Sequence, residues 1–468
     1  MTSSPYLSLS ASRVAVAGAG VTGKSVAKAL EKLGAVITLV DDNVTEVEDF
    51  AVLAPSAITE DDFDYLMISP GWREDHPLVQ LARSCGKAIL NEIDLAWHLK
   101  TIHAPAQKWL ALTGTNGKTT TVEMTAHILN HAGVKAIACG NVGNTVVDAV
   151  MSKENYDYLI LELSSFQLHW AENPQFVSAA ILNIAQDHVD WHGSFDAYRS
   201  DKFKILQSCS TAILNGDDPE VVVPASHWLG RKVFFTLDTP KPGELGLIEE
   251  LLVDRAFVAD PQEATMIAEL TEVIPTAPHQ VANALASAGL ALTIGISHEK
   301  IREAISTFRP GKHRIETVAI IDGIQWVDDS KATNPHAAGA SVTSFEKVIW
   351  IAGGLAKGAS MEELVVRIAR RLEAVILIGH DREIIHAELL KHAPDVPVHF
   401  VDTPHGYIKG SEDNLFMESV VSKAREIAGE NSVILLAPAC ASMDQFVSYA
   451  DRGNRFAAAV KNLEGTHG

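Results

Sequence analysis

The sequence predicts an α/β protein built from several parallel sheets. Short runs of β-branched and other apolar residues recur along the chain, and each ends at or near Gly, Asp, Asn or Ser before a longer stretch with helical apolar spacing. This alternation is typical of βα units around a parallel sheet. At 468 residues, the chain is long enough for about three domains, each with its own core.

The expected strands fall into three groups along the chain. They are Val14–Ala17, Val36–Val40 and Tyr65–Ser69 in the first group; Trp109–Thr113, Tyr158–Leu163, Ala179–Asn183 and Thr211–Asn215 in the second; and Val348–Ala352, Ala374–Ile378, Val398–Val401 and Val433–Ala437 in the third. Polar or Pro-containing connections near Lys100–Lys108 and Phe308–His313 separate the groups. We therefore predict domains at residues 1–103, 104–310 and 311–468.

Composition restricts the class of partner. The chain has 38 Lys and Arg residues against 59 Asp and Glu residues, a formal charge of −21, which argues against a general nucleic-acid binder because phosphates would be repelled. Its four cysteines form no CxxC pair, so neither a zinc ribbon nor a disulfide framework is indicated. Residues 1–13 are polar, and no segment approaches the ~18 unbroken apolar residues of a membrane helix. We expect a cytoplasmic protein with no membrane segment.

A first Gly-rich turn follows the first expected strand. Gly18-Ala19-Gly20-Val21-Thr22-Gly23 is a GxGxxG between a strand and a helix, a setting in which the backbone can approach a pyrophosphate. Asp41 ends the second expected strand, where an acidic residue would hold a ribose. By itself the motif favours NAD binding, and a glycine turn needed only for tight packing is the alternative.

A second Gly-rich loop predicts a triphosphate site. Gly114-Thr115-Asn116-Gly117-Lys118-Thr119-Thr120 lies between an expected strand and an apolar-periodic helix. Such a loop wraps backbone N–H groups around phosphates, with Lys118 on the β- and γ-phosphates and the Thr119 hydroxyl on Mg²⁺. It departs from GxxxxGK[ST], because Leu112 stands six positions before Lys118 and the glycine stands four before it.

Two further segments supply candidate cation contacts. Glu162 lies inside an apolar strand, where an ionised carboxylate is costly to bury unless a cation meets it; a Glu at a strand tip facing water is the alternative. His188 and His192 follow another apolar run, but Val189 stands where the Glu of HExxH would be, which argues against a zinc protease. We expect a second Mg²⁺ contact or a phosphate hydrogen bond here, and a structural histidine is a serious alternative for His192.

Two polar segments near the C-terminus also follow expected strands. They are Asp328-Asp329-Ser330-Lys331-Ala332-Thr333-Asn334-Pro335 and Ala437-Pro438-Ala439-Cys440-Ala441-Ser442-Met443-Asp444-Gln445-Phe446. Charge clusters are usually solvated, but side chains at the carboxyl ends of α/β strands face the crevice where ligands bind. Cys440 has no assigned His partner, so we favour a small buried thiol over a nucleophile.

These motifs together resemble the Mur ligase family. GTNGKT, ELSSFQL, NIAQDHVDWH, HRIE, DDSKATNP and PACASMDQF occur in that order and cover nearly the whole chain. Single motifs are shared with sister ligases and with folylpolyglutamate synthases, whereas SSFQL with PACAS-x-DQF is most similar to the member that adds D-glutamate to UDP-N-acetylmuramoyl-L-alanine. The DNPR string expected of the meso-diaminopimelate-adding member does not occur.

The resemblance implies a fold and an activity. It implies a Rossmann-like N-terminal domain that holds uridine diphosphate, a central P-loop ATPase-like domain with a parallel sheet, and a C-terminal Rossmann-like α/β domain. It also implies a monomeric ATP-dependent ligase of peptidoglycan precursor synthesis that uses ATP, two Mg²⁺ ions and an acyl-phosphate intermediate.

The resemblance also implies roles for residues at matching positions. The ATP contacts would be Gly114, Thr115, Asn116, Gly117, Lys118, Thr119, Thr120, Asn283, Arg314 and Asp329. The catalytic residues would be Lys118, Glu162, His188 and Lys202. The metal contacts would be Thr119, Glu162, His188 and Lys202. The UDP-sugar would meet Val21, Thr22, Asp41, Asn141, Ser164, Gln167 and His188, and D-glutamate would meet Lys331, Thr333, Lys357, Ser442, Met443 and Tyr449. Lys202 stands where the family carries a carbamylated lysine. Three positions differ from the usual family pattern: Asn43 replaces a basic residue, Gln280 replaces an Asn and Tyr449 replaces a Phe.

Two other classes of protein remain as alternatives. A nicotinamide-dependent dehydrogenase would explain Gly18–Gly23 and Asp41 but would leave the GTNGKT loop without a role. A nucleotide-dependent switch would explain that loop, but no NKxD string for reading guanine occurs. Within the ligases, a sister enzyme that adds another amino acid is the third alternative.

Overall fold

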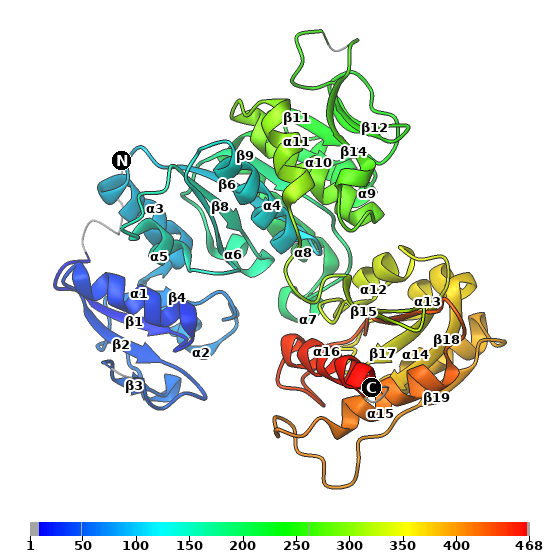
Figure 1. Ribbon diagram of the computed structural model, residues 1–468. Coiled ribbons are helices and arrows are strands. Elements are labelled where there is room, and N and C mark those ends of the chain that lie inside the picture. The colour runs from blue at the N-terminus through cyan, green and yellow to red at the C-terminus, as the bar shows by residue number, and fades with distance from the viewer. Residues whose placement is uncertain (1–8, 48, 261, 466–468) are drawn as a thin grey trace. The chain divides into compact units, whose positions relative to one another are not determined.

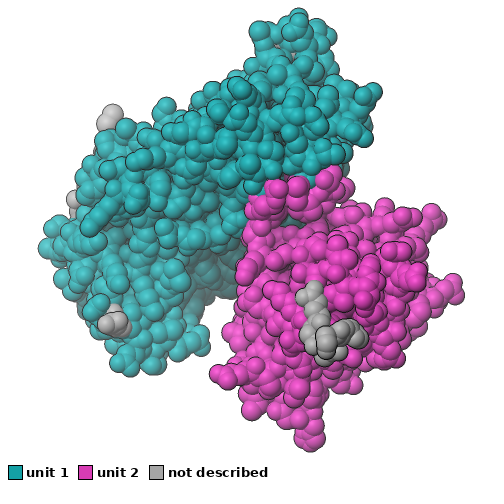
Figure 2. Space-filling view, in the orientation of Figure 1, with its two compact units in different colours: residues 1–273, 282–308 teal, residues 274–281, 309–468 magenta. Residues whose placement is uncertain are grey.

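A computed structural model describes residues 9–47, 49–260 and 262–465, so the polar stretch at residues 1–8 lies outside the described residues. The chain forms two compact units, shown in Figure 2. Unit 1 consists of the chain up to Val273 together with Ala282–Phe308, and unit 2 of Ile274–Val281 together with Arg309–Gly468. The described residues form three separate sheets, two in unit 1 and one in unit 2 (Figure 1).

The first sheet of unit 1 has five parallel strands in the order β3-β2-β1-β4-β5. Its strands are β1 (Arg13–Ala17), β2 (Val36–Val40), β3 (Val52–Leu53), β4 (Tyr65–Ile68) and β5 (Ala88–Asn91), and its helices are α1 (Val21–Lys32), α2 (Pro77–Ser84) and α3 (Glu92–His103), with a 3-10 turn at Pro55–Ala57. Helix α1 begins directly after the Gly-rich turn that follows β1. This is the βαβ arrangement that places a helix N-terminus at the carboxyl edge of a sheet.

The second sheet of unit 1 has nine strands in the order β14-β13-β12-β11-β10-β9-β6-β8-β7. They are β6 (Lys108–Thr113), β7 (Ala136–Gly140), β8 (Tyr158–Glu162), β9 (Phe176–Ile181), β10 (Cys209–Asn215), β11 (Arg231–Phe235), β12 (Glu244–Ile248), β13 (Leu251–Asp254) and β14 (Thr265–Glu269). The strands from β7 to β12 pair in parallel, while β12, β13 and β14 form an antiparallel meander at one edge.

In the described part of this region, eight α-helices accompany the central sheet. They are α4 (Lys118–His131), α5 (Val146–Val150), α6 (Ser165–Trp170), α7 (Val189–His192), α8 (Phe195–Phe203), α9 (Pro219–Ala225), α10 (Pro278–Thr293) and α11 (His298–Thr307), with 3-10 turns at Lys204–Ser208 and Leu270–Glu272. Strand β6 lies in the interior of the sheet between β8 and β9, and its residues Trp109–Leu112 are almost fully buried. The loop after β6 is therefore held by a strand with neighbours on both sides.

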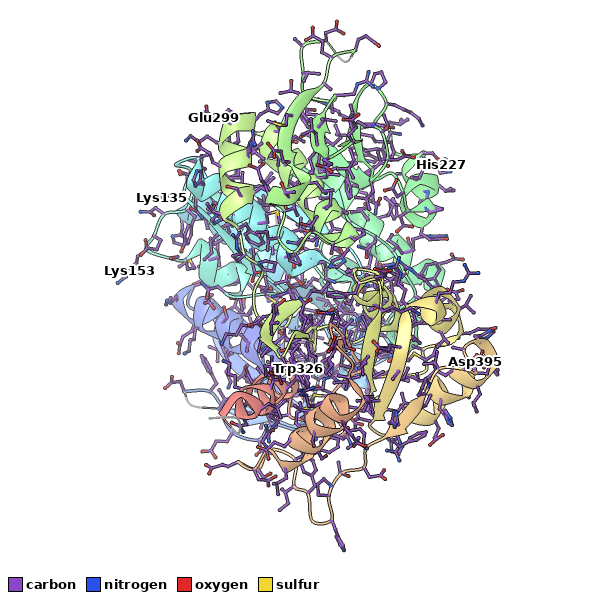
Figure 3. The ribbon with its side chains drawn as sticks, turned by 45° about the vertical axis from the view of Figure 1, so that its right-hand side comes forward. Lys135, Lys153, His227, Glu299, Trp326 and Asp395 are labelled. Atoms are coloured by element: carbon purple, nitrogen blue, oxygen red, sulfur yellow. The ribbon has the colours of Figure 1, made fainter. Side chains whose placement is uncertain are left out.

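The sheet of unit 2 has six strands in the order β15-β16-β20-β17-β18-β19, of which only the β15–β16 hairpin is antiparallel. They are β15 (Glu316–Ile321), β16 (Ile324–Asp328), β17 (Val348–Gly353), β18 (Leu372–Ile378), β19 (Val398–Phe400) and β20 (Val433–Leu436). The helices are α12 (Pro335–Val342), α13 (Glu362–Ile368), α14 (Arg382–His392), α15 (Leu415–Ile427) and α16 (Tyr449–Gly465), with a 3-10 turn at Ala369–Arg371. Trp326, labelled in Figure 3, is fully buried, and its ring centre lies 6.2 Å from that of Phe456 in α16.

The α/β prediction is confirmed, and each expected strand is present within a few residues of its predicted bounds. The antiparallel strands β12–β14 and β15 were not predicted. Within the described part of the chain, no helix combines the length and apolar character needed to cross a bilayer.

Candidate active site

The loop between β6 and α4 is organised around Gly117 and Lys118. Gly117 caps α4 with a left-handed φ of +83°, and a Cβ added there would lie 2.5 Å from Asn283 Oδ1. The Lys118 Nζ donates to the carbonyl oxygens of Gly114 and Thr115, both at 2.9 Å. The ammonium therefore lies within the loop, where a phosphate could exchange for these carbonyl contacts.

Neighbouring elements fix the backbone of this loop. The Asn116 N–H donates to Asn183 Oδ1 at 2.8 Å, and Asn183 Nδ2 donates back to the Asn116 carbonyl at 3.0 Å. The Thr115 hydroxyl lies 2.9 Å from the hydroxyl of Tyr198 in α8. The loop is thus preorganised by contacts from the end of β9 and from α8.

Glu162 ends β8, which pairs with β6 so that Glu162 lies opposite Leu112. Its side chain is only 2% exposed, and its Oε1 accepts a hydrogen bond of 2.9 Å from Asn141 Nδ2. Its Oε2 is buried and has no hydrogen-bond partner among the described residues. A buried carboxylate oxygen without a donor is a costly arrangement that a cation would relieve. A carboxylate oxygen is a ligand type that Mg²⁺ prefers, so the chemistry of this buried oxygen fits that ion.

Lys202 brings a second amine to the loop. It lies in α8, is 2% exposed, and its Nζ donates to the Gly114 carbonyl at 2.7 Å and lies 4.7 Å from the centre of the Tyr198 ring. Burial, and then the positive charge of Lys118, hold the pKa of Lys202 well below its usual value, against the attraction of acidic neighbours that include Glu162. Burial among these neighbours therefore favours the neutral amine over the ammonium.

His188 precedes the one-turn helix α7 with a left-handed φ of +51°. Its ring centre lies 4.8 Å from that of Phe166. Burial lowers the pKa of His188, and the nearby charges of Lys202 and Lys118 act in the same direction while Asp187 opposes them. The neutral imidazole is thereby favoured over the charged one, and the neutral ring is the form that binds a metal ion.

The first Gly-rich turn is fixed by Asp41. Its Oδ2 accepts from the Ala19 N–H at 2.8 Å, and its Oδ1 accepts from the N–H groups of Asn43 and Val44 at 2.9 Å each. Burial opposes ionisation, but these three backbone donors outweigh it and lower the pKa of Asp41. Val21 is 75% exposed beside this turn. A cavity of about 380 Å³ is lined by Asp42, Ala54, Pro55, Ser56, His76 and Pro77.

The other residues expected at the sugar lie near Glu162. Asn141 contacts Glu162 directly, as described above. Ser164 and Gln167 form a capping box at the start of α6, in which the Ser164 Oγ accepts from the Gln167 N–H and the Gln167 Oε1 accepts from the Ser164 N–H. Of the expected residues in unit 1, Lys202 interacts electrostatically with Lys118 and Glu162, and His188 interacts with Lys118 and Lys202.

The expected residues of unit 2 come from several elements. Asp329, Lys331 and Thr333 follow β16, and Ser442 and Met443 follow β20. Arg314 precedes β15, Lys357 follows β17 and Tyr449 begins α16. Asp329 is buried between the Ile315 N–H and the Ser341 hydroxyl, and burial raises its pKa to about 7. The Lys331 ammonium lies 4.0 Å from the centre of the Tyr449 ring. Ser442 is buried and Met443 is exposed after β20, whereas Lys357 is exposed with a left-handed φ of +50°. Arg314 and Thr333 are partly exposed in the segments beside Asp329.

Several buried charged residues escaped the sequence analysis. The guanidinium of Arg452 is fully buried and donates to the carbonyls of Ser330 and Cys440 at 3.0 and 3.2 Å, so it joins the two polar segments of unit 2. Burial lowers its pKa to about 10. Glu92 in α3 accepts from the N–H groups of Val146 and Val147 at 2.6 and 3.2 Å, and burial raises its pKa to about 7. A lone Arg or Glu on a helix gives no local signal of such contacts.

A phosphate-type loop beside a buried acid and a buried amine defines a nucleotide-dependent enzyme on an α/β fold. Residues 112–291 match the Mur ligase middle domain and residues 313–440 match the Mur ligase glutamate ligase domain. The chain therefore belongs to the Mur ligase family, whose members are ATP-dependent ligases.

Relatives named UDP-N-acetylmuramoylalanine–D-glutamate ligase match almost the full chain. The protein from Streptomyces avermitilis is 45% identical, with 96% of this chain and 98% of that protein covered. The protein from Thermobifida fusca is also 45% identical, over 97% of this chain and 99% of that protein.

Solved structures support the fold. The UDP-N-acetylmuramate–alanine ligase MurC from Thermotoga maritima aligns with a TM-score of 0.59 at 20% identity, over 97% of this chain and all of that chain. The MurF ligase from Thermotoga maritima, solved in complex with ADP, aligns with a TM-score of 0.56 at 15% identity, over 98% of this chain and 97% of that chain.

Proposed function

We propose that this Mur ligase adds D-glutamate to UDP-N-acetylmuramoyl-L-alanine and converts ATP to ADP and phosphate, a step of peptidoglycan precursor synthesis and hence of cell wall biogenesis. The names of the full-length relatives support the choice of substrates. The observation that carries the chemistry is the placement of Lys118 at the start of α4, after the loop that follows β6, and of the unpartnered Glu162 oxygen at the end of β8, the strand paired with β6.

ATP is required because a carboxylate is a poor electrophile and amide formation in water is uphill. An oxygen of the alanyl carboxylate attacks the γ-phosphorus in line, the bond to the β,γ-bridging oxygen breaks, and ADP leaves. Lys118, freed from the loop carbonyls, compensates the charge that develops on the transferred group. The deprotonated amine of D-glutamate then attacks the acyl carbon, and phosphate leaves from the tetrahedral intermediate.

Two Mg²⁺ ions are part of the proposal. When bound, they would neutralise phosphate charge and keep the two reacting anions from repelling each other. Thr119 and Glu162 would hold one ion, while His188 and Lys202 would serve the second. The lowered pKa of Lys202 supports this role, because a carbamate forms only from the neutral amine.

Substrate contacts follow the same assignment. Val21, Thr22, Asp41, Asn141, Ser164, Gln167 and His188 would bind the nucleotide sugar; Gly114–Thr120, Asn283, Arg314 and Asp329 would bind ATP; and Lys331, Thr333, Lys357, Ser442, Met443 and Tyr449 would bind D-glutamate. The domain bounds at 103/104 and 310/311, a monomeric state and a cytoplasmic location belong to the same proposal.

The test is phosphate release from ATP in the presence of UDP-N-acetylmuramoyl-L-alanine and a panel of D- and L-amino acids. We expect turnover with D-glutamate only. Turnover with another amino acid would identify a sister ligase, and release independent of any amino acid would contradict the ligase assignment.

A further inference from the structure

A buried carboxylate stands next to Lys202 in the sequence but faces another side of α8. Asp201 is 7% exposed, and its Oδ2 accepts from the Nδ1 atoms of His169 at 2.8 Å and His192 at 3.0 Å. Its Oδ1 lies 2.8 Å from the Lys204 ammonium. Burial opposes ionisation, but these three donors outweigh it and hold the pKa of Asp201 well below its usual range.

The far sides of both imidazoles are also occupied. The Nε2 of His192 lies 3.0 Å from the Ser165 hydroxyl at the start of α6, and the His192 side chain is 1% exposed. The Nε2 of His169 lies 3.2 Å from Glu74 Oε1, in the segment that follows β4. The network therefore links α8 to α6, to α7 and to the N-terminal sheet.

Helix geometry separates the tasks of Asp201 and Lys202. Consecutive residues of an α-helix point about 100° apart, whereas residues four apart share a face. Lys202 and Tyr198 thus both face the loop after β6, and Asp201 faces α6 and α7. The contacts of Asp201 fix the rotation of α8 about its axis, and with it the direction of Lys202.

The same network reaches His188 through His192. The amide of His192 donates to the His188 carbonyl at 3.1 Å, so the two residues bound a single helical turn. The His192 ring stacks on the Phe166 ring, with ring centres 5.5 Å apart and an angle of 8° between the planes. The same Phe166 ring lies 4.8 Å from the ring centre of His188. A left-handed backbone at a non-Gly residue costs on the order of 1–3 kcal/mol and persists only where its surroundings hold it.

Two His and one Asp could also form a metal site, since their ligand atoms lie within 4.8 Å of one another. The Lys204 ammonium, however, is paired with Asp201, and each ring nitrogen of His169 and His192 has a partner. A fully satisfied network with a lysine on its carboxylate favours a structural ion network over a bound cation.

We propose that Asp201 is a positioning residue of the ligase site, which orients α8 so that Lys202 meets the phosphate loop and, through His192, holds the turn that carries His188. The inference rests on the proposed roles of Lys202 and His188. It assigns Asp201 no contact with substrate.

The test compares Asp201→Asn with Asp196→Asn. The Asn amide keeps one acceptor oxygen but replaces the other with a donor, so one set of Asp201 contacts is lost. Asp196 serves as the control because it lies in the same helix, its side chain is 81% exposed, and among the described residues it pairs only with Arg199. We expect Asp201→Asn to lower kcat about tenfold, in line with the cost of a small misplacement. The Mg²⁺ concentration for half-maximal rate should rise several-fold in Asp201→Asn and should stay at the parental value in Asp196→Asn.

A purely structural role predicts a different result. Partial unfolding lowers the active fraction without moving the Mg²⁺ requirement, so an unchanged Mg²⁺ requirement in Asp201→Asn, or the same shift in Asp196→Asn, would overturn the proposal. Zn²⁺ bound one-to-one by the parent and lost in Asp201→Asn would overturn it in favour of a metal site.

A second pair of variants covers the case in which Asp201→Asn does not fold. His192→Asn keeps a donor near the position of Nδ1, whereas His192→Phe keeps the ring on Phe166 but removes that donor. We expect the Phe variant alone to reproduce the Mg²⁺ shift, and equal behaviour of the two would contradict the proposal. Lys202→Ala serves as the reference variant. Full activity in Lys202→Ala would remove the proposed role of Lys202. Loss of activity in Lys202→Ala, with parental behaviour of Asp201→Asn, would refute only the positioning role of Asp201.

Discussion

Gly117→Ala offers a direct test of the phosphate loop, because the chain contains a matched control. Gly117 and Gly133 lie at opposite ends of α4, and both have a φ of +83°. A methyl group at Gly133 would meet no atom within 4 Å, whereas at Gly117 it would lie 2.5 Å from the Oδ1 of buried Asn283. The two substitutions therefore share one backbone penalty and differ in one contact.

The expected magnitudes follow from this difference. A left-handed alanine costs roughly 1–2 kcal/mol, which is the loss expected in urea unfolding for Gly133→Ala. Gly117→Ala should lose about 1 kcal/mol more, because a buried side chain must move to accept the methyl group. Displacement of Asn283 should also abolish the rise in melting temperature that ATP and Mg²⁺ produce, and Gly133→Ala should retain that rise. If both variants lose the same stability and both still respond to nucleotide, the loop assignment is wrong.

Three further predictions concern other residues. Glu162→Gln should reduce Mg²⁺-dependent phosphate release by at least about a hundredfold, because the anionic oxygen that would meet the cation is replaced by an amide; a phosphate assay that finds parental turnover would exclude Glu162 as a cation contact. Glu92→Gln should remove a pH dependence: burial raises the pKa of Glu92 from 4.5 to about 7, so its stabilising contribution is present below pH 4.5 and is lost as the pH rises through 7. The variant should be more stable than the parent by up to about 3 kcal/mol at pH 8 and equally stable at pH 4.5, and a constant difference in unfolding free energy would contradict this. Lys357→Ala should raise KM for D-glutamate about tenfold through loss of one charged hydrogen bond, and an unchanged KM in steady-state assays would remove Lys357 from the amino-acid site.

The strand, loop and helix around the expected phosphate site were predictable because their signal is local. The residues from Gly114 to Thr120 stand between a strand and a helix in a continuous stretch of sequence, and the structure places β6 and α4 there. Glu162 was predictable for a related reason, since a carboxylate in an apolar strand implies burial. The exposure of 2% bears out that reasoning.

The contacts of Asp201 were not predictable in the same way. His169 lies 32 residues before Asp201, and Glu74 lies 95 residues before His169, so no spacing rule connects them. The sequence is compatible with either a structural or a functional role for His192. In the structure, both ring nitrogens of His192 contact protein side chains, Asp201 and Ser165, which favours the structural role. The meander from β12 to β14 was missed because its strands have only four or five residues, one of them with a glycine, and so give little alternation.

The path of the chain between the two units restricts how the protein can be divided. Unit 2 is not a continuous stretch, because it includes Ile274–Val281, and Ala277 of that segment is 2% exposed within the core of unit 2. A fragment that starts at Arg309 would lack this piece, and one that ends at Val273 would lack the two helices that finish unit 1. No single cut can therefore yield two intact folding units. Truncated or split versions of the protein must keep residues 274–281 with unit 2 and residues 282–308 with unit 1.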